Sequence, residues 1–177
     1  MPSPVSTIAP IVSAEAAAEL ATAWRSEGKT VVFTNGHFDL LHIGHLHYLQ
    51  SARAQGDCLI VGLNSDDSTR MRKGADRPII PQEERSVLLA ALRCVDAVVL
   101  FDTADCSDLV AIIRPDVYVK GADWNRPGGP RPPEAGVVTG YGGRVAYVDL
   151  VPVRSTTAII QTIVQRYQTA GDDDRQE

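Results

Sequence analysis

The sequence predicts a single α/β domain, a doubly wound parallel sheet of about five strands with helices on both faces. Its 177 residues are the size of one ordinary domain. Along the chain, short apolar runs rich in Val and Ile alternate with longer segments of helical periodicity, and no internal repeat interrupts them. Such alternation is typical of a parallel sheet that is covered on both faces.

Five apolar runs are expected to be the strands: 30–35, 58–64, 97–101, 117–120 and 144–150. Helices are expected between and around them: from Ser13, a good cap, to about Glu27 before Gly28; through Leu46, Leu49 and Ala52 to about Gly56; from Pro81 through Leu92; from Asp105 to Arg114; and from Ser155 to about Tyr167. Residues 126–133 are too rich in Pro and Gly for regular structure, so we expect a surface loop.

Both ends of the chain are expected to lie outside the folded domain, which we place at 13–168. Residues 1–12 contain three prolines and are predicted to be a flexible arm, and residues 169–177 are predicted to be an acidic disordered tail. The net charge is −5, and much of it lies in that tail. Nucleic-acid and membrane partners are therefore disfavoured.

The cysteines and the apolar runs point to a reducing, cytoplasmic setting. Cys58, Cys94 and Cys106 are too few and too scattered for a disulfide framework or a Cys-x-x-Cys metal site. The first residues do not have the pattern of a signal peptide, and no apolar run approaches the roughly 20 residues of a membrane span.

The chemistry is expected just after the strands, since ligands of open parallel sheets bind beyond the carboxyl ends of the strands. The segment after the first strand contains His42, Gly44 and His45 at the start of a helix. The two histidines face the same side, Gly44 lets an anion approach the backbone, and the helix start supplies free N–H groups. Imidazole groups there can stabilise charge on a phosphoryl oxygen.

Two other interpretations of these histidines are possible. One histidine can cap or pack while the other is solvated, as in many histidine pairs. The cluster of His42, His45 and His47 can also suggest a metal site, but residues two apart on a helix diverge and no cysteine completes the set. We therefore expect no metal bound by these side chains.

The run Gly-x-Phe-Asp-x-x-His-x-Gly-His at 36–45 resembles the signature of the nucleotidylyltransferase superfamily. The resemblance implies a Rossmann-like fold and an in-line attack on the α-phosphorus of a nucleoside triphosphate, with Mg²⁺ accompanying the nucleotide. Further residues recur in order: Asn64-Ser65-Asp66, Lys73-Gly74, Arg77-Pro78, Pro81 with Arg85, Val95-Asp96, Pro115-Asp116, Val119-Lys120-Gly121-x-Asp123 and Ser155-Thr156-Thr157.

Together these motifs, from about Lys29 to Tyr167, resemble the adenylyltransferases that make ADP-heptose from ATP and D-glycero-β-D-manno-heptose 1-phosphate. In many bacteria this domain is fused behind a sugar kinase, and the present chain resembles the stand-alone form. The resemblance thus implies a separate heptose kinase as a metabolic neighbour, a homodimer, and a product used for lipopolysaccharide or another surface glycan.

The resemblance also assigns residues to roles. The catalytic residues are His42, His45 and Lys73. The nucleotide-binding residues are Asn35, Gly36, Phe38, Asp39, Gly44, Lys120, Gly121, Asp123, Arg154, Ser155, Thr156 and Thr157. The substrate-binding residues are Asn64, Asp66 and Arg85, with a structural role as the alternative for Asn64 and Asp66.

Several of these residues also have simpler interpretations. Lys73 fits a solvated basic loop as well as a phosphate ligand. Arg85 is a cation in the first turns of a helix, opposing the dipole, so it needs a partner, either a surface acid or a substrate phosphate. Asp39 can orient a histidine or the Mg²⁺-nucleotide, or bond its own turn. Trp124 can stack on a ring or pack, and Ser155 can serve only as a helix cap.

Two alternative functions remain open. The same reaction with CTP and glycerol 3-phosphate is favoured by Arg154, because a nearby arginine occurs in glycerol-phosphate cytidylyltransferases, and Ala122 and Trp124 also depart from the usual heptose-enzyme pattern. A nucleotide-binding module without catalysis is the other alternative. It is disfavoured because every motif position holds a chemically competent residue.

Overall fold

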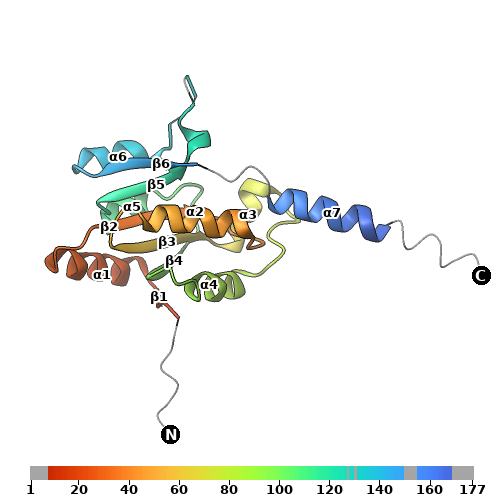
Figure 1. Ribbon diagram of the computed structural model, residues 1–177, viewed down its shortest axis with the longest axis horizontal. Coiled ribbons are helices and arrows are strands. Elements are labelled where there is room, and N and C mark those ends of the chain that lie inside the picture. The colour runs from red at the N-terminus through yellow and green to blue at the C-terminus, as the bar shows by residue number, and fades with distance from the viewer. Residues whose placement is uncertain (1–7, 127, 130, 150–154, 169–177) are drawn as a thin grey trace, which may run out of the picture.

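Six parallel strands form one sheet in the order β1-β4-β3-β2-β5-β6 (Figure 1). The computed structural model describes residues 8–126, 128–129, 131–149 and 155–168. The strands are β1 (Ile11–Val12), β2 (Val31–Gly36), β3 (Cys58–Asn64), β4 (Ala97–Phe101), β5 (Val117–Gly121) and β6 (Arg144–Val148). β3 and β4 have the predicted bounds, because each is an uninterrupted apolar run.

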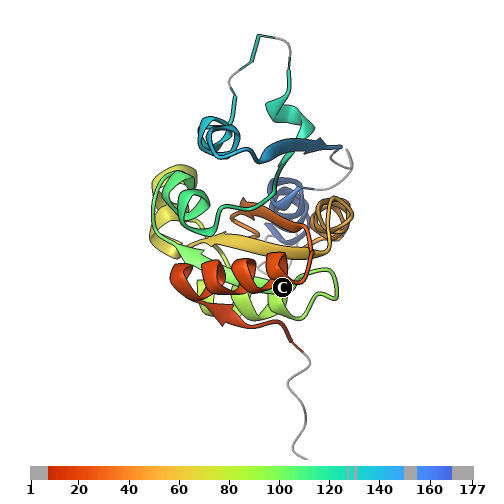
Figure 2. The same ribbon diagram turned by 90° about the vertical axis from the view of Figure 1, so that its left-hand side faces the viewer.

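Helices cover both faces of this sheet: α1 (Ala14–Ser26), α2 (Ile43–Arg53), α3 (Asp66–Lys73), α4 (Gln82–Ala90), α5 (Ser107–Ile113), α6 (Glu134–Gly140) and α7 (Thr156–Gln168), with the short 3₁₀ turn η1 (Ala122–Trp124). One core packs α2 and α4 against the sheet through Leu49 and Leu89, and the other packs α1 and α5 through Ala17 and Val110. Figure 2 shows α5 and α6 on the side opposite α2. The prediction of a doubly wound sheet is confirmed.

The strand order reverses at β2. From β2 the chain proceeds through β3 to β4 on one side, and then returns to β5 and β6 on the other. The loops that leave β2 and β5 therefore diverge and open a crevice beyond the carboxyl ends of these strands, where ligands bind in folds of this class.

The sheet has six strands where about five were expected. The additional strand, β1, lies within the segment predicted to be a flexible arm, and Ile11 and Val12 pair with Val98 and Val99 at the sheet edge. Two residues between prolines and a helix give too short a pattern to identify a strand from sequence. The remainder of the arm (1–7), residue 150 of the predicted last strand, and the acidic tail (169–177) lie outside the described residues.

Two helices were not expected. α3 occupies the stretch that was interpreted as a basic loop, and it is bounded by the cap Ser65, whose hydroxyl accepts the Ser68 N–H, and by Gly74 at φ 98°. Its sequence is almost entirely polar, so it has no apolar stripe to reveal it. α6 follows the Pro- and Gly-rich loop and itself contains two glycines. In the part of the chain that the structure describes, no helix is both long and apolar enough to cross a membrane.

Candidate active site

A cleft of about 680 Å³ opens at the crevice between β2 and β5. Its walls come from the end of β2, the start of α2, the end of α3, η1 and the start of α7. The volume is within the range of small-molecule sites. Its lining combines several rings with charged side chains of both signs, the cations Arg72, Lys73, Arg77 and Lys120 and the acids Asp39, Asp105, Asp123 and Glu134.

His42 and His45 form the side of the cleft at the beginning of α2. His42 is the N-cap of this helix, and its Nδ1 accepts the backbone N–H of His45 at 3.3 Å. The two rings stack with their centroids 3.8 Å apart and their planes 18° apart. Tyr48 anchors the same helix to the sheet, since its hydroxyl bonds the Thr34 hydroxyl and donates to the Val119 carbonyl. The pair is thus fixed at the positive end of a helix.

The protonation state of His45 follows from its surroundings. Burial lowers the pKa of His45 to about 4, and the charge of His42 lowers it further. The ring is therefore neutral at pH 7. Within the described residues its buried Nδ1 has no hydrogen-bond partner, while Phe38 meets the ring edge-on at 5.2 Å. A buried polar atom without a partner is costly, and a ligand in the cleft would satisfy it.

Cations gather on the wall formed by α3 and the loop that follows it. Arg72, Lys73 and Arg77 all line the cleft. They act on His37, which lies in the same wall: burial lowers the pKa of His37 to about 4, and Lys73 and Arg72 reinforce the shift. This part of the cleft therefore has a positive potential, which favours phosphate groups.

The opposite wall is built around Lys120 at the end of β5. Its Nζ donates to Asn35 Oδ1 at 2.8 Å and lies 5.3 Å from the centre of the Trp124 ring. Burial lowers the pKa of Lys120 from its ordinary value. Glu134 also lines this wall; it is buried and accepts the Cys106 N–H at 3.2 Å. The lysine is thus held at the carboxyl end of the sheet, in the lining of the same cleft as the histidine pair.

Asp39 closes the loop below the histidines. Its Oδ2 accepts from Arg77 Nε, and its Oδ1 accepts the Ile79 N–H at 2.7 Å. The carboxylate is 3% exposed. Among the described residues its hydrogen bonds go neither to a histidine nor to its own turn, but fasten the 77–80 loop to the segment that follows β2. The role in binding the nucleotide stays a prediction.

The profile of the cytidylyltransferase-like family matches residues 33–135, which run from within β2 past β5 and include the histidine pair. The chain belongs to this family. Membership confirms the resemblance drawn from the 36–45 motif.

Among cytidylyltransferase-like relatives, Bifunctional protein HldE of Syntrophotalea carbinolica is 53% identical over 148 residues, which are 81% of this chain and 29% of that protein. Bifunctional protein HldE of Geobacter sulfurreducens is 51% identical over 152 residues, which are 85% and 30% of the two chains. The chain thus spans less than a third of the length of these relatives. The crystal structure of the lipopolysaccharide core biosynthesis protein from Thermoplasma volcanium superposes with a TM-score of 0.56 at 28% identity, covering 70% of this chain and 98% of that one.

Most of the residues predicted from the motifs of this family line the one cleft. They are the expected catalytic residues His42, His45 and Lys73, the expected nucleotide-binding residues Asn35, Gly36, Phe38, Asp39, Gly44, Lys120, Gly121, Asp123, Ser155, Thr156 and Thr157, and the expected substrate-binding residue Asn64. Arg154 lies outside the described residues. The roles of these residues remain predictions; the structure brings the residues together.

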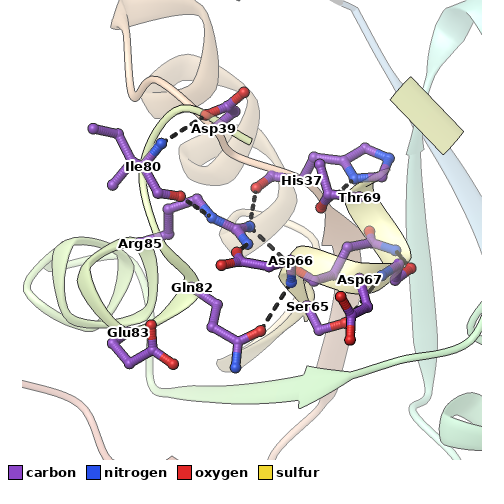
Figure 3. Close-up of polar contacts among 12 residues, drawn as sticks. His37, Asp39, Ser65, Asp66, Asp67, Thr69, Ile80, Gln82, Glu83 and Arg85 are labelled. Atoms are coloured by element: carbon purple, nitrogen blue, oxygen red, sulfur yellow. Dashed lines mark hydrogen bonds and ion pairs between the residues drawn. The ribbon is translucent and has the colours of Figure 1, made fainter. Parts of the chain in front are cut away.

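Asp66 and Arg85 are the exceptions. Neither lines the cleft, and the Arg85 side chain is 1% exposed, with its guanidinium bonded to protein atoms (Figure 3). In this structure the partner of this cation is not a surface acid on its own helix. It is Asp66 together with the backbone carbonyls of His37, Asn64 and Ile80.

Sequence reasoning missed several residues of the cleft: His37, Tyr48, Arg72, Arg77 and Glu134. A signal existed for two of them, since Arg72 adjoins Lys73 and Arg77 belongs to a quoted motif. For Tyr48 the only signal was its helical spacing from His45, which places both residues on the same side of α2. Glu134 follows a loop without regular structure, so nothing in the sequence indicates that it approaches Lys120.

Proposed function

We propose that this protein transfers an adenylyl group from ATP to D-glycero-β-D-manno-heptose 1-phosphate, giving ADP-heptose and pyrophosphate. The observation that carries the proposal is the stacked pair His42–His45 at the start of α2, facing the same cleft as Lys73 and Lys120. The extensive identity to the HldE proteins supports the choice of heptose as the acceptor. The name of the Thermoplasma protein supports a use of the product in lipopolysaccharide synthesis.

In this reaction a phosphate oxygen of the sugar attacks the α-phosphorus of ATP. The bond to the bridging oxygen of the β-phosphate breaks on the opposite side, and pyrophosphate leaves with that electron pair. The dianionic acceptor is already a competent nucleophile, so catalysis reduces to positioning and charge stabilisation. His42, His45 and the first N–H groups of α2 would stabilise the negative charge that grows on the α-phosphoryl oxygens.

The acceptor phosphate and the leaving pyrophosphate would bind to two other parts of the lining. Lys73 and Arg77 would hold the acceptor phosphate, because their positive field acts on the side of the cleft occupied by His37. Ser155, Thr156 and Thr157 would bind the leaving pyrophosphate at the start of α7, where hydroxyl and N–H groups are combined. Ser155 already caps this helix, accepting the Ala158 N–H at 3.1 Å, and the two roles are compatible.

Mg²⁺ would accompany ATP and supply charge neutralisation on the triphosphate. Among the described residues there is no group of three His, Cys, Asp or Glu side chains that could hold a metal ion. Asp39 is occupied by Arg77 and by the 79–80 backbone. The cations Lys73 and Lys120 bind phosphate whether or not the metal is present.

A second candidate keeps the chemistry and changes the pair of substrates to CTP and glycerol 3-phosphate. The description of the family as cytidylyltransferase-like is the observation that favours it. Against it stands the identity of about 50% to proteins named HldE.

Two partners follow from the proposal. A sugar kinase must supply the 1-phosphate. The name of the bifunctional relatives supports the idea that such a kinase step and the transfer step are linked. A second copy of the chain is the other partner, because the last turns of α7 extend beyond the sheet with Ile163, Val164 and Tyr167 exposed (Figure 1). Light scattering on the purified protein tests the dimer: a mass of twice 19.1 kDa supports it, and a monomer contradicts it.

Pyrophosphate release tests the function. The purified protein with Mg²⁺ is supplied with ATP, CTP, GTP or UTP, each against the β-heptose 1-phosphate and glycerol 3-phosphate, with the double variant His42→Ala/His45→Ala as an inactive control. Release with ATP and heptose phosphate alone is the expected result. Release with CTP and glycerol 3-phosphate would replace the proposal by the second candidate. Nucleotide binding without release for any pair would favour the non-catalytic module.

A further inference from the structure

Arg85 is the most deeply buried charged side chain near the cleft, and its donors are committed to the protein. Its Nε donates to the Ile80 carbonyl at 2.8 Å. Its Nη1 donates to two carbonyls, that of His37 at 2.6 Å and that of Asn64 at 2.9 Å, and its Nη2 pairs with Asp66 Oδ1 at 2.7 Å. A guanidinium has five N–H groups, so four of the five are used within the chain.

The acceptors come from separate parts of the chain that meet under the cleft. The His37 carbonyl directly follows β2, the Asn64 carbonyl ends β3, and the Ile80 carbonyl belongs to the loop that Asp39 also holds. Figure 3 shows Arg85 at the centre of these contacts, with Asp66 beside it. One rigid, planar fork thus fixes the spacing between the ends of two neighbouring strands.

Asp66 receives a second contact from the same helix. The side-chain oxygen of Gln82 accepts the Asp66 N–H at 2.8 Å, while Arg85 binds the Asp66 carboxylate. Asp66 is the first residue of α3, and Lys73 is the last. α4 therefore holds α3 at its beginning, and the direction of α3 decides where Arg72 and Lys73 stand in the cleft.

These contacts argue against phosphate binding by Arg85. To reach a ligand the guanidinium would have to leave three carbonyls and a carboxylate, and each would lose its charged donor in a buried place. The helix dipole disfavours a cation at this position, and the acceptors around the guanidinium offset that cost. The same acceptors would be left without a donor if the side chain turned toward the cleft.

We propose that Arg85 is a positioning residue for the transfer reaction: without touching either substrate, it holds the His37 and Asn64 carbonyls and the start of α3, and thereby places Lys73 and the loop that leads into the histidine pair. The inference rests on the proposed function for its reaction but not for its geometry. A lysine at this position carries the charge but not the planar fork, so Arg85→Lys isolates the geometric contribution.

Steady-state kinetics of Arg85→Lys and Asp66→Asn test the proposal, with Glu84→Gln, an exposed residue of the same helix, as the matched control. We expect kcat to fall about 10- to 100-fold in each variant, because a displacement of about 1 Å is enough for such a loss, while KM for both substrates stays within about threefold. The double variant should lose no more than the worse single variant, because both changes break the same contact. Glu84→Gln should match the wild type.

Three results would overturn the proposal: an unchanged kcat in folded Arg85→Lys, a tenfold or larger rise in KM for either substrate with kcat retained, or additive losses in the double variant. If Arg85→Lys does not fold, Asp66→Asn carries the test, since it keeps the arginine. Only a loss of kcat per folded molecule distinguishes positioning from simple structural support.

A second measurement separates this inference from the proposed function. If the wild type shows no transfer with any pair of substrates, the proposed function fails, and hydrogen exchange with titration of inorganic pyrophosphate decides the role of Arg85. We then expect amide exchange at 64–69 and 79–80 to become about tenfold faster in Arg85→Lys, with pyrophosphate affinity within about threefold of the wild type. Unchanged exchange, or a tenfold loss of pyrophosphate affinity, would contradict the positioning role.

Discussion

The cleft has two polar regions that look alike in sequence and differ in structure. The rim, defined as His42, His45 and Lys73, faces the cavity. The layer beneath it, defined as Asp39 and Arg85, is buried. Both of its charged groups are hydrogen-bonded to backbone groups and to an oppositely charged side chain. Lys73 is exposed, and within the described residues it has no acidic partner or hydrogen bond.

This difference teaches how a charged residue beside a motif obtains its role. The number of protein acceptors around it decides whether it is available to a ligand. Arg85 has four such contacts and Lys73 has none among the described residues, although both were assigned to substrate phosphates from the sequence. Changes in the rim should therefore affect catalysis, and changes in the layer should affect stability as well.

The largest effect is expected in the rim. The double variant His42→Ala/His45→Ala should lose activity by about 10⁴-fold, about 5.5 kcal/mol in activation free energy, because two groups that stabilise the transition state are removed. The variant should stay folded, with only the loss of about 1 kcal/mol expected when the cap of α2 is removed. His47→Ala, an exposed residue of the same helix outside the cleft, is the matched control and should keep full activity. Activity of the double variant within tenfold of the wild type would contradict the catalytic role.

The next effect concerns the buried layer. Arg85→Met should lower the free energy of unfolding by about 3–5 kcal/mol, because it leaves Asp66 and three carbonyls without their charged donor. Arg70→Met removes an exposed ion pair with Asp67 and a longer one, of 4.0 Å, with Asp66, and should cost about 0–1 kcal/mol. Urea denaturation measures both. A loss below 1 kcal/mol for Arg85→Met would erase the distinction between the two regions.

A smaller effect is expected when one cation of the rim is removed. Lys73→Met should raise KM for the acceptor phosphate about 10- to 100-fold, or about 1.4–2.7 kcal/mol, with stability unchanged, because its ammonium contacts solvent rather than protein. Arg70→Met, on the same helix but outside the cleft, serves again as the control. If Lys73→Met lost stability and kept its KM, Lys73 would belong with the buried layer.

The smallest effect is the dependence of stability on pH. Burial lowers the pKa of His37 and of His45 to about 4, so the folded state keeps both rings neutral below pH 6.5 while the unfolded state takes up protons. Stability is therefore fully present above about pH 6.5 and falls as pH drops toward 4, on the order of 1 kcal/mol for each ring after allowance for partial exposure. Denaturation of His37→Gln at pH 7, 6 and 5 checks this, since its slope should be shallower. If the stability of His37→Gln fell more steeply with falling pH than that of the wild type, the predicted contribution of His37 would have the wrong sign.

The five longer strands could be predicted because each contains a short apolar run, whereas β1, with two residues, could not. β3 matches the predicted residues 58–64, and β2 is shifted by only one residue. α3 could not be predicted from periodicity, because its buried residues are Ser68 and Thr69. Only the pair of caps around it, Ser65 and Gly74, carried a signal.

The rim could likewise be predicted, because its residue types and spacing carry the chemistry directly. The layer could not be. The role of Arg85 depends on two strand ends and a loop that approach it from 5 to 48 residues away in sequence. Local sequence shows a cation that needs a partner, but which partner it finds is decided by the packing of α4 against the sheet.

Transfer of label from ATP tests the central claim most directly. The wild-type protein is incubated with Mg²⁺, the β-heptose 1-phosphate and ATP labelled at the α-phosphorus. The products are then separated and identified by mass spectrometry. The account predicts that the label appears in a nucleoside diphosphate sugar with the mass of ADP-heptose, in equal amount to the pyrophosphate released. Label that stays in ATP, while CTP labelled at the same phosphorus reacts with glycerol 3-phosphate, would contradict the account.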